Sequence, residues 1–367
     1  MSYFSNVANT RSMNATSSSA TEKDTELANP PTDSISSISF SGQANYVAVR
    51  IYEVASNGQS QGKAMYSHHG PVLNVCWSND GTKVFSSSAD NTARAFDLST
   101  GQDVQVAQHD APVKSIRWVD APLSGGMLVT RSWDKMLKYW DLRTPTTIAT
   151  VNLPERRYTL DMQYPCLIVG CAEQQVMIYD LKNPTTKISP LKRQLRVARA
   201  FTNSAGDRGF ALGGVDRRLA ISYIEDKDAA ECYSFKAHRL STTPTSNDQA
   251  IVHCVNDIAF HPVHGTFATS GSDGGVHFWD GEARVRVKTF DRYPTAISSV
   301  AFNKDGTLFA YALSYDWHKG HAGVATMPNQ NQTKIMLHRC KDEEMDMPRR
   351  LVIFIPVLPE SSVFARH

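Results

Sequence analysis

Residues 255–284 read VNDIAFHPVHGTFATSGSDGGVHFWDGEAR and predict three short β-strands joined by turns. The first apolar run ends at His261-Pro262, the second covers residues 266–270, and the third covers residues 276–279. The segment 271–274 between the last two runs has the composition of a tight turn, because glycine accepts positive φ and aspartate bonds nearby backbone groups. The third run closes with an aromatic residue followed by aspartate. The stretch therefore predicts a small antiparallel sheet.

The same order of strands and turns recurs along the chain. Units begin near residues 34, 69, 109, 158, 198, 255 and 297. Their spacing of roughly 40–50 residues is typical of propeller blades. The fourth unit is degenerate and has Ala172-Glu173 at the position of a turn aspartate. Because one blade cannot bury both faces of its sheet, it must stack on its neighbours. The chain is therefore predicted to be an all-β protein, a seven-bladed WD-repeat β-propeller.

One aspartate recurs in the turn of five units, at Asp90, Asp134, Asp216, Asp273 and Asp316. Because these aspartates occur once per unit, they are spread around the ring and do not converge on a catalytic centre. We interpret them as structural residues that bond the tight turn and a nearby histidine or backbone group. The alternative class, a propeller hydrolase with a central metal, needs a converging set of carboxylates. We expect no enzymatic activity, no cofactor and no small-molecule substrate.

Metal-binding and membrane-spanning motifs are also missing from the sequence. His261-x-x-His264 and His318-x-x-His321 have a spacing that metal ligands use, but the sequence places no third ligand beside either pair. The six cysteines form no C-x-x-C pair and are expected to be reduced. No apolar run reaches the roughly 18 residues that a membrane helix needs. We expect a protein without a metal site or a membrane segment.

Three regions are expected along the chain. Residues 1–33 contain 15 Ser, Thr or Asn residues and are predicted to be a disordered arm. Residues 34–344 form the propeller, and residues 345–367 form a divergent tail that includes the apolar run LVIFIPVL. The first blade is short, because the step from Phe40 to Tyr52 is 12 residues whereas the step from Trp77 to Phe96 is 19. To close the ring, this blade and residues 333–337 have to meet.

Positive charge is local rather than general in this chain. Lys and Arg number 38 against 36 Asp and Glu, so any nucleic-acid role must rest on a patch. Residues 181–199 hold six basic residues and no acid, and Arg217, Arg218, Lys236 and Arg239 follow. Phe235 lies beside Lys236 and would anchor a peptide. The region is either a solvated basic face or a site for an acidic peptide or a phosphate backbone.

Several stretches resemble one family, the WD-repeat mRNA export factors of the nuclear pore. The resemblance covers most of residues 66–344, and its most specific stretches are SWDKMLKYWDLR (132–143), GFALGGVDRRLAISYI (209–224) and FAYALSYDWHKGH (309–321). It implies a non-catalytic propeller that binds the GLEBS motif of an FG-repeat nucleoporin and acts in poly(A) mRNA export. It also implies residence in the nucleus, at the nuclear pore complex and envelope, with shuttling to the cytoplasm.

The resemblance assigns residues to two sites. Arg218, Phe235 and Lys236, with Arg239 nearby, match the family's GLEBS-binding surface. Trp279 and Arg284, with Arg286 nearby, match a side groove that is expected to meet nucleic acid. The alternative within the same class is a spindle-checkpoint or kinetochore adaptor, which binds GLEBS-like peptides of checkpoint kinases.

The residues themselves suggest how the side groove would bind single-stranded RNA. Asp280-Gly281 ends the strand after Trp279, which places this ring at the rim of the sheet. Residues 282–288 alternate apolar and basic, so Arg284, Arg286 and Lys288 are expected on one side of a strand. Bases would then stack on the ring and phosphates would pair with the cations, giving weak, salt-dependent binding. The alternative is that Trp279 packs against its own blade.

Overall fold

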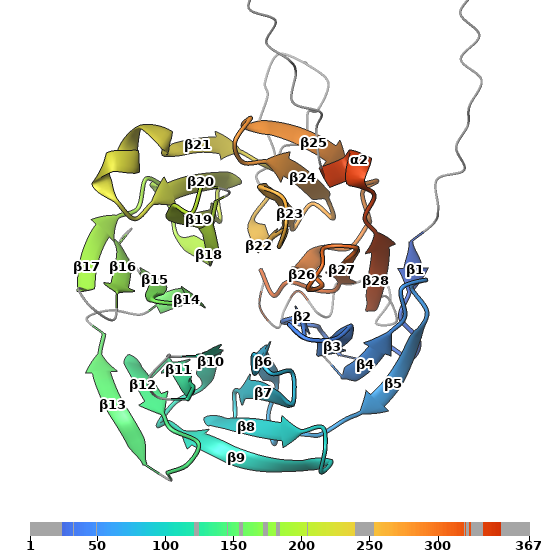
Figure 1. Cartoon of the computed structure of the whole chain (residues 1–367), viewed down its shortest axis with the longest axis vertical. Coiled ribbons are helices and arrows are strands. Elements are labelled where there is room, and N and C mark those ends of the chain that lie inside the picture. The colour runs from blue at the N-terminus through green and yellow to red at the C-terminus, as the bar shows by residue number, and fades with distance from the viewer. Residues whose placement is uncertain are drawn as a thin grey trace, which may run out of the picture.

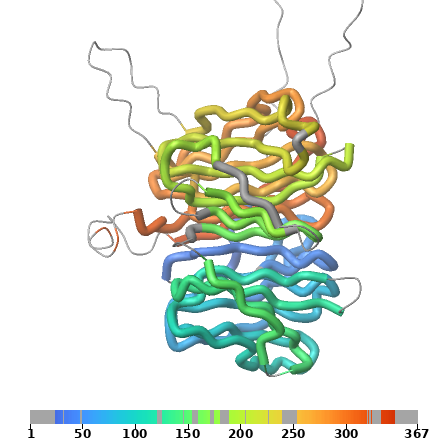
Figure 2. Tube along the Cα trace, turned by 90° about the vertical axis from the view of Figure 1, so that its left-hand side faces the viewer, coloured from blue at the N-terminus to red at the C-terminus, as the bar shows by residue number. Residues whose placement is uncertain are grey.

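The structure is a computed structural model that describes residues 24–31, 33–48, 50–120, 125–144, 146–153, 157–171, 175–180, 184–203, 205–238, 253–318, 320, 323 and 333–345. Within these residues, seven four-stranded antiparallel sheets surround a central channel, which confirms the seven-bladed propeller (Figure 1). Seen from the side, the strands run across the thickness of the disc (Figure 2). No helix in the described part is long and apolar enough to cross a membrane.

Each blade is built from four strands, which follow one another from the channel outward. Blades 1 and 2 are β2 (Ser39–Phe40), β3 (Tyr46–Ala48), β4 (Ile51–Val54), β5 (Ser60–Ala64), and β6 (Val72–Trp77), β7 (Lys83–Ser88), β8 (Thr92–Asp97), β9 (Gln102–Gln108). Blades 3 and 4 are β10 (Val113–Val119), β11 (Met127–Ser132), β12 (Met136–Trp140), β13 (Thr147–Asn152), and β14 (Arg157–Gln163), β15 (Cys166–Cys171), β16 (Gln175–Asp180), β17 (Pro184–Ile188). Blades 5 and 6 are β18 (Leu195–Thr202), β19 (Arg208–Gly214), β20 (Arg218–Tyr223), β21 (Tyr233–Lys236), and β22 (Val255–Phe260), β23 (Thr266–Gly271), β24 (Val276–Asp280), β25 (Val285–Thr289). Blade 7 is β26 (Ile297–Phe302), β27 (Leu308–Leu313), β28 (Lys334–Arg339) and β1 (Thr25–Glu26).

The N-terminal strand β1 closes the ring. It pairs with β28 so that Thr25 lies opposite Leu337 and Glu26 opposite Met336. We expected residues 333–337 to meet the first blade. In the structure, β28, which contains residues 334–337, pairs instead with β1, which precedes residue 34. The propeller includes residues that we expected in the N-terminal arm, because blade 7 takes its outer strand from residues 25–26. Residues 1–23 and the tail after Met345 lie outside the described residues.

The first blade is short but has all four strands. Ala48 and Ile51 lie opposite each other on β3 and β4, so the connection between these strands is only two residues long. The equivalent strands of blade 2 are each 6 residues long, whereas β3 has 3 residues and β4 has 4. The missing residues therefore come from the two central strands and their turn, and the blade keeps its outer strand β5.

A circuit of hydrogen bonds joins the innermost strands of all seven blades. Each link crosses from one blade to the next at similar depth in the channel, at distances of 2.5 to 3.0 Å. In blade order, the linked groups are the side chains of Ser37, Asn74, Arg117 and Asp161, the backbone N–H of Ala200, and the side chains of Arg199, Asp257 and Ser299. The Ser299 hydroxyl accepts from the backbone N–H of Ile38, which closes the circuit. Because these polar groups lie in the interior, their mutual bonds remove the cost of burying them.

Candidate protein-binding and RNA-binding surfaces

Three turn aspartates pair with a histidine of the preceding loop. The Asp carboxylate lies 3.1 Å from His68 in blade 2, 2.8 Å from His109 in blade 3 and 2.8 Å from His238 in blade 6. The three aspartates are Asp90, Asp134 and Asp273, and each also accepts from a backbone N–H two residues further on. In blades 3 and 6 the far nitrogen of the histidine meets a threonine hydroxyl, which in turn accepts from a tryptophan N–H. These contacts give the aspartates a structural role in their turns.

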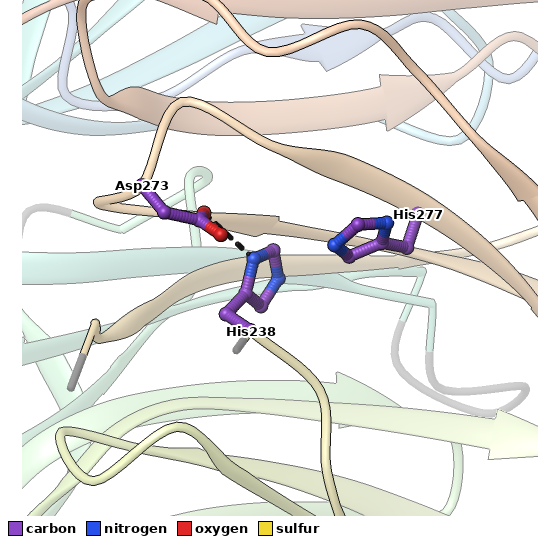
Figure 3. A group of neighbouring side chains, drawn as sticks. All are labelled: His238, Asp273 and His277. Carbon is purple, nitrogen blue, oxygen red and sulfur yellow. Dashed lines mark hydrogen bonds and ion pairs between the residues drawn. The ribbon is translucent and has the colours of Figure 1, made fainter. Parts of the chain in front are cut away.

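The blade 6 histidine is part of a cluster with metal-ligand chemistry. Ligand atoms of His238, Asp273 and His277 lie within 4.8 Å of one another (Figure 3). However, Asp273 and Thr269 occupy the two ring nitrogens of His238, and Arg292 lies 3.2 Å from the second oxygen of Asp273. Burial lowers the pKa of His277 to about 3 and keeps its ring neutral. We interpret the cluster as part of the turn, since a cation would compete with Arg292 for the carboxylate.

The two histidine pairs singled out in the sequence do not form metal sites from the described residues. The Nε2 of His261 donates to the Gly306 carbonyl, and its Nδ1 accepts from the backbone N–H groups of Val263 and His264, so neither nitrogen is left for a metal. His318 is hydrogen-bonded to Asp316, and His321 lies outside the described residues.

The two remaining turn aspartates have different partners. Asp216 lies 3.9 Å from Arg218. Asp316 is bonded to Ser272, and it lies 3.3 Å from Asn256 and 3.8 Å from Arg196. Asp316 therefore ties blade 7 to residues of blades 5 and 6 around the channel, which is more than the turn contact that we expected of it.

Arg218 and Lys236 form a basic pair on blade 5. They lie directly opposite each other on β20 and β21, so their side chains share one face of the sheet. Lys236 is exposed, and the Arg218 side chain is 43% exposed. Both lie next to the turn that carries Asp216, and the pair offers cations for an acidic ligand.

Phe235 does not share this face. As the neighbour of Lys236 on β21, it points to the opposite side of the sheet. Its ring is half-buried against Trp279 of blade 6, with ring centroids 4.6 Å apart. The expectation of an exposed Phe235 ring on the same surface as Lys236 is therefore wrong, and Phe235 packs with Trp279. Arg239 lies outside the described residues.

Trp279 is a core residue rather than an open stacking platform. Only 8% of it is exposed, and its indole N–H donates to the Thr269 hydroxyl at 2.9 Å. Phe235 packs on the ring, and the guanidinium of Arg286 lies 5.9 Å from its centroid. The prediction that the end of the strand leaves this ring open is wrong, because the outer strands of blades 5 and 6 cover it.

The three cations after Trp279 do not line up on one side of β25. The strand pairing is irregular between Phe278 and Trp279, which reverses the alternation of faces beyond that point. Arg284 and Arg286 turn toward blade 5, where Arg284 lies 4.7 Å from the Tyr233 ring and 2.7 Å from Glu231. Lys288 turns toward blade 7 and binds Glu344 at 2.6 Å. The side groove therefore has two cations, not three.

Part of the basic stretch 181–199 also lies inside the ring. Arg199 binds Asp257 at 2.5 Å and Arg196 donates to the backbone oxygen of Asp316 at 2.6 Å, both within the channel. These two residues are structural and do not extend the basic surface. Lys192 and Arg193 are exposed, and Lys182 lies outside the described residues.

The exposure of two tryptophans was not predicted from the sequence. Trp133 is 58% exposed and Trp317 is 51% exposed, and both adjoin a turn aspartate. They therefore lie on the face of the ring that carries the aspartate turns, as does the Arg218–Lys236 pair. The sequence does contain a signal for them, because Trp133-Asp134 and Asp316-Trp317 place a large apolar residue in a tight turn.

The fold and its His–Asp turns define a WD-repeat β-propeller. The WD domain, G-beta repeat family model matches residues 60–97 and 245–280. The chain is 47% identical to the poly(A)+ RNA export protein of Schizosaccharomyces pombe, over 94% of this chain and 98% of that protein. It is 46% identical to the mRNA export factor GLE2 of Chaetomium thermophilum (88% and 92% covered) and 43% identical to protein Rae1 of Drosophila melanogaster (90% and 97% covered). The chain belongs to this family of WD-repeat mRNA export factors.

A solved structure shares the fold at greater distance. A chain in a structure titled "Crystal Structure of Mitotic Checkpoint Complex" matches with a TM-score of 0.64 at 14% identity, covering 92% of this chain and 97% of that chain. At this identity the likeness shows the propeller fold alone. The names of the relatives do not favour the checkpoint or kinetochore alternative.

Proposed function

We propose that the protein is a non-catalytic adaptor in the export of poly(A) mRNA from the nucleus. The observation that carries this proposal is its relationship, over nearly the whole chain, to proteins named for mRNA export. A propeller suits an adaptor, because its rigid ring presents several binding surfaces at once. On this proposal the protein works in the nucleus, at the pore complex and envelope, and shuttles to the cytoplasm.

The proposed docking partner is the GLEBS motif of an FG-repeat nucleoporin. An extended peptide with acidic and apolar residues fits the face of the ring that carries the aspartate turns. On that face Arg218 and Lys236 offer aligned cations, and Trp133 and Trp317 offer exposed apolar surface. Large aromatic residues and arginine are the side chains that contribute most to protein–protein binding.

Calorimetry with a GLEBS-type peptide tests this docking site. Arg218→Glu with Lys236→Glu should weaken binding at least tenfold, because the two new carboxylates repel an acidic ligand. The matched control is Lys63→Glu, which reverses the charge of an exposed side chain on the outer strand of blade 1. Both proteins should melt like the parent. An unchanged affinity in the double variant would place the peptide elsewhere.

We also propose that RNA binds at the side groove through its phosphates. The observation that favours this is the pair Arg284 and Arg286 at the edge of β25, each held over an aromatic ring. Because Trp279 is covered, the groove offers cations rather than a stacking surface. Binding should be weak, salt-dependent and indifferent to sequence.

A further inference from the structure

A cavity lies in the central channel at the end opposite the aspartate turns. The cavity has a volume of about 610 Å³ and is lined by residues of all seven blades. It lies where the innermost strands end, at Trp77 of β6, Phe260 of β22 and Phe302 of β26. Cavities of roughly 300–1,000 Å³ are the size that hold small organic ligands.

Three aromatic rings form part of the cavity wall, and neighbouring side chains hold them in place. Trp118, Phe260 and Phe302 are half-buried and line the cavity. Trp118 stacks on Phe85 at 5.1 Å, and Phe302 packs on Phe309 at 4.7 Å. Because these rings are already ordered, a flat ligand would lose little free energy in arranging them.

Among the described residues, the charged side chains that line the cavity are Arg117, Asp161 and Arg199, and all three belong to the hydrogen-bonded circuit. Asp257 pairs with Arg199 in the same circuit. Asp161 accepts from Arg117 and from the N–H of Ala200. Asp257 accepts from Arg199, Ser299 and two backbone N–H groups, those of Ile258 and Val300. Both oxygens of each carboxylate therefore have partners.

The two guanidinium groups keep N–H groups to spare. Arg117 uses Nε and Nη1, and among the described residues no acceptor bonds its Nη2. Arg199 makes one bond from each of its three nitrogens, although a guanidinium carries five N–H groups. The Arg117 and Asp161 side chains are 15% and 13% exposed, and those of Arg199 and Asp257 are 23% and 6% exposed. The polar part of the cavity can donate hydrogen bonds but has no carboxylate oxygen without a partner.

We propose that this cavity binds a small organic anion with a flat apolar body and one phosphate or carboxylate group. The anion would accept from the guanidinium groups of Arg117 and Arg199, and the flat body would lie against the ring of Trp118, Phe260 or Phe302. Guanidinium groups suit this task because their donors match phosphate and carboxylate oxygens. Since each arginine is paired with an aspartate, the attraction comes from directed N–H groups and the affinity is modest.

Calorimetry with four probes tests the two required features separately. Adenosine monophosphate and indole-3-acetate carry both a flat body and an anionic group. Adenosine lacks the anion, and inorganic phosphate lacks the flat body. We expect the first two to bind and the last two to bind at least tenfold more weakly. If adenosine binds as tightly as its monophosphate, or if no probe binds at millimolar concentration, the proposal is wrong.

A variant without the Arg199–Asp257 ion pair locates the site. Arg199→Met with Asp257→Asn removes both charges of one ion pair, so that neither charge is left without its partner, and it should weaken adenosine monophosphate binding at least tenfold. The matched control is Arg143→Met with Asp141→Asn, which removes an exposed ion pair outside the cavity and should leave binding unchanged. Unchanged binding in a folded cavity variant would overturn the proposal.

Trp118→Phe decides the matter if the cavity variant does not fold. It keeps the charges and shortens the aromatic wall, so it should weaken binding of the monophosphate and reduce the quenching of tryptophan fluorescence that the probe causes. Arg284→Glu with Arg286→Glu should leave both readouts unchanged. If only the second variant loses binding, the probe occupies the RNA groove and not the channel.

Discussion

The hydrogen bond of the Trp279 indole decides whether this ring or the neighbouring arginines can contact a ligand. The indole N–H is committed to Thr269, and that hydroxyl also meets His238, so the ring belongs to the turn of its own blade. Arg284 and Arg286 remain at the edge, where phosphates can reach them. On the proposed function, phosphates would therefore meet the two cations and not the indole ring.

This separation predicts different effects for two substitutions on binding of single-stranded poly(A) RNA. Arg284→Glu with Arg286→Glu should reduce the steepness of the slope of log affinity against log salt concentration by about 1.4, because each phosphate contact to a single strand contributes ~0.7 to that slope. Trp279→Phe should leave RNA affinity and slope unchanged but lower the free energy of unfolding by about 1–3 kcal/mol, because it leaves a buried hydroxyl with one partner fewer. Filter binding at several salt concentrations measures both. Loss of affinity in Trp279→Phe at an unchanged salt slope would mean that bases stack on this ring.

Strand β1 is held to blade 7 by a cluster centred on His338. The two ring nitrogens of His338 meet Asp24 at 2.7 Å and Glu344 at 2.9 Å, so one side chain contacts residues from both ends of the described chain. Lys288 binds the carboxylate of Glu344, and the Tyr311 hydroxyl donates to the carboxylate of Asp24. Burial lowers the pKa of His338, but the hydrogen bonds to Asp24 and Glu344 outweigh it, and the pKa is raised above the ordinary value. His338 is therefore charged more readily in the folded ring than in the unfolded chain.

The raised pKa predicts a pH-dependent closure of the ring. The contribution of His338 should be complete below its unfolded pKa of about 6.5 and should fade as the pH rises through the higher folded pKa. His338→Gln should cost about 1–3 kcal/mol at pH 5.5 and less at pH 9, because a charged hydrogen-bonded pair is lost only at low pH. Thermal melting across this range measures the difference. The exposed His69→Gln serves as a control, and a cost for His338→Gln that grows with pH would contradict this account.

Elements also show where sequence reasoning succeeds and where it stops. The period of strands and turns predicts the seven blades, because each blade repeats one local pattern. This period does not predict the irregular pairing of β24 with β25 at Phe278 and Trp279. One extra residue in one of two paired strands leaves the composition of both strands unchanged. The period also cannot show that Arg199 meets Asp257, because these residues come together only when blades 5 and 6 stack.

At the scale of the whole molecule, the ring separates its surfaces. The face with the aspartate turns carries Arg218, Lys236 and the two exposed tryptophans. Trp279, Arg284 and Arg286 lie between the outer strands of blades 5 and 6, and the cavity opens at the other end of the channel. On the proposed function, this arrangement would let a nucleoporin segment and an mRNA bind without competing for one surface.

Affinity capture from nuclear extract tests the central claim most directly. The tagged parent chain should retain an FG-repeat nucleoporin that contains a GLEBS motif, together with poly(A) RNA. Arg218→Glu with Lys236→Glu should lose the nucleoporin and keep the RNA, while Lys63→Glu should keep both. Mass spectrometry and oligo(dT) probing measure the two partners. Retention of kinetochore kinases without any nucleoporin, or equal nucleoporin recovery by the double variant, would contradict this account.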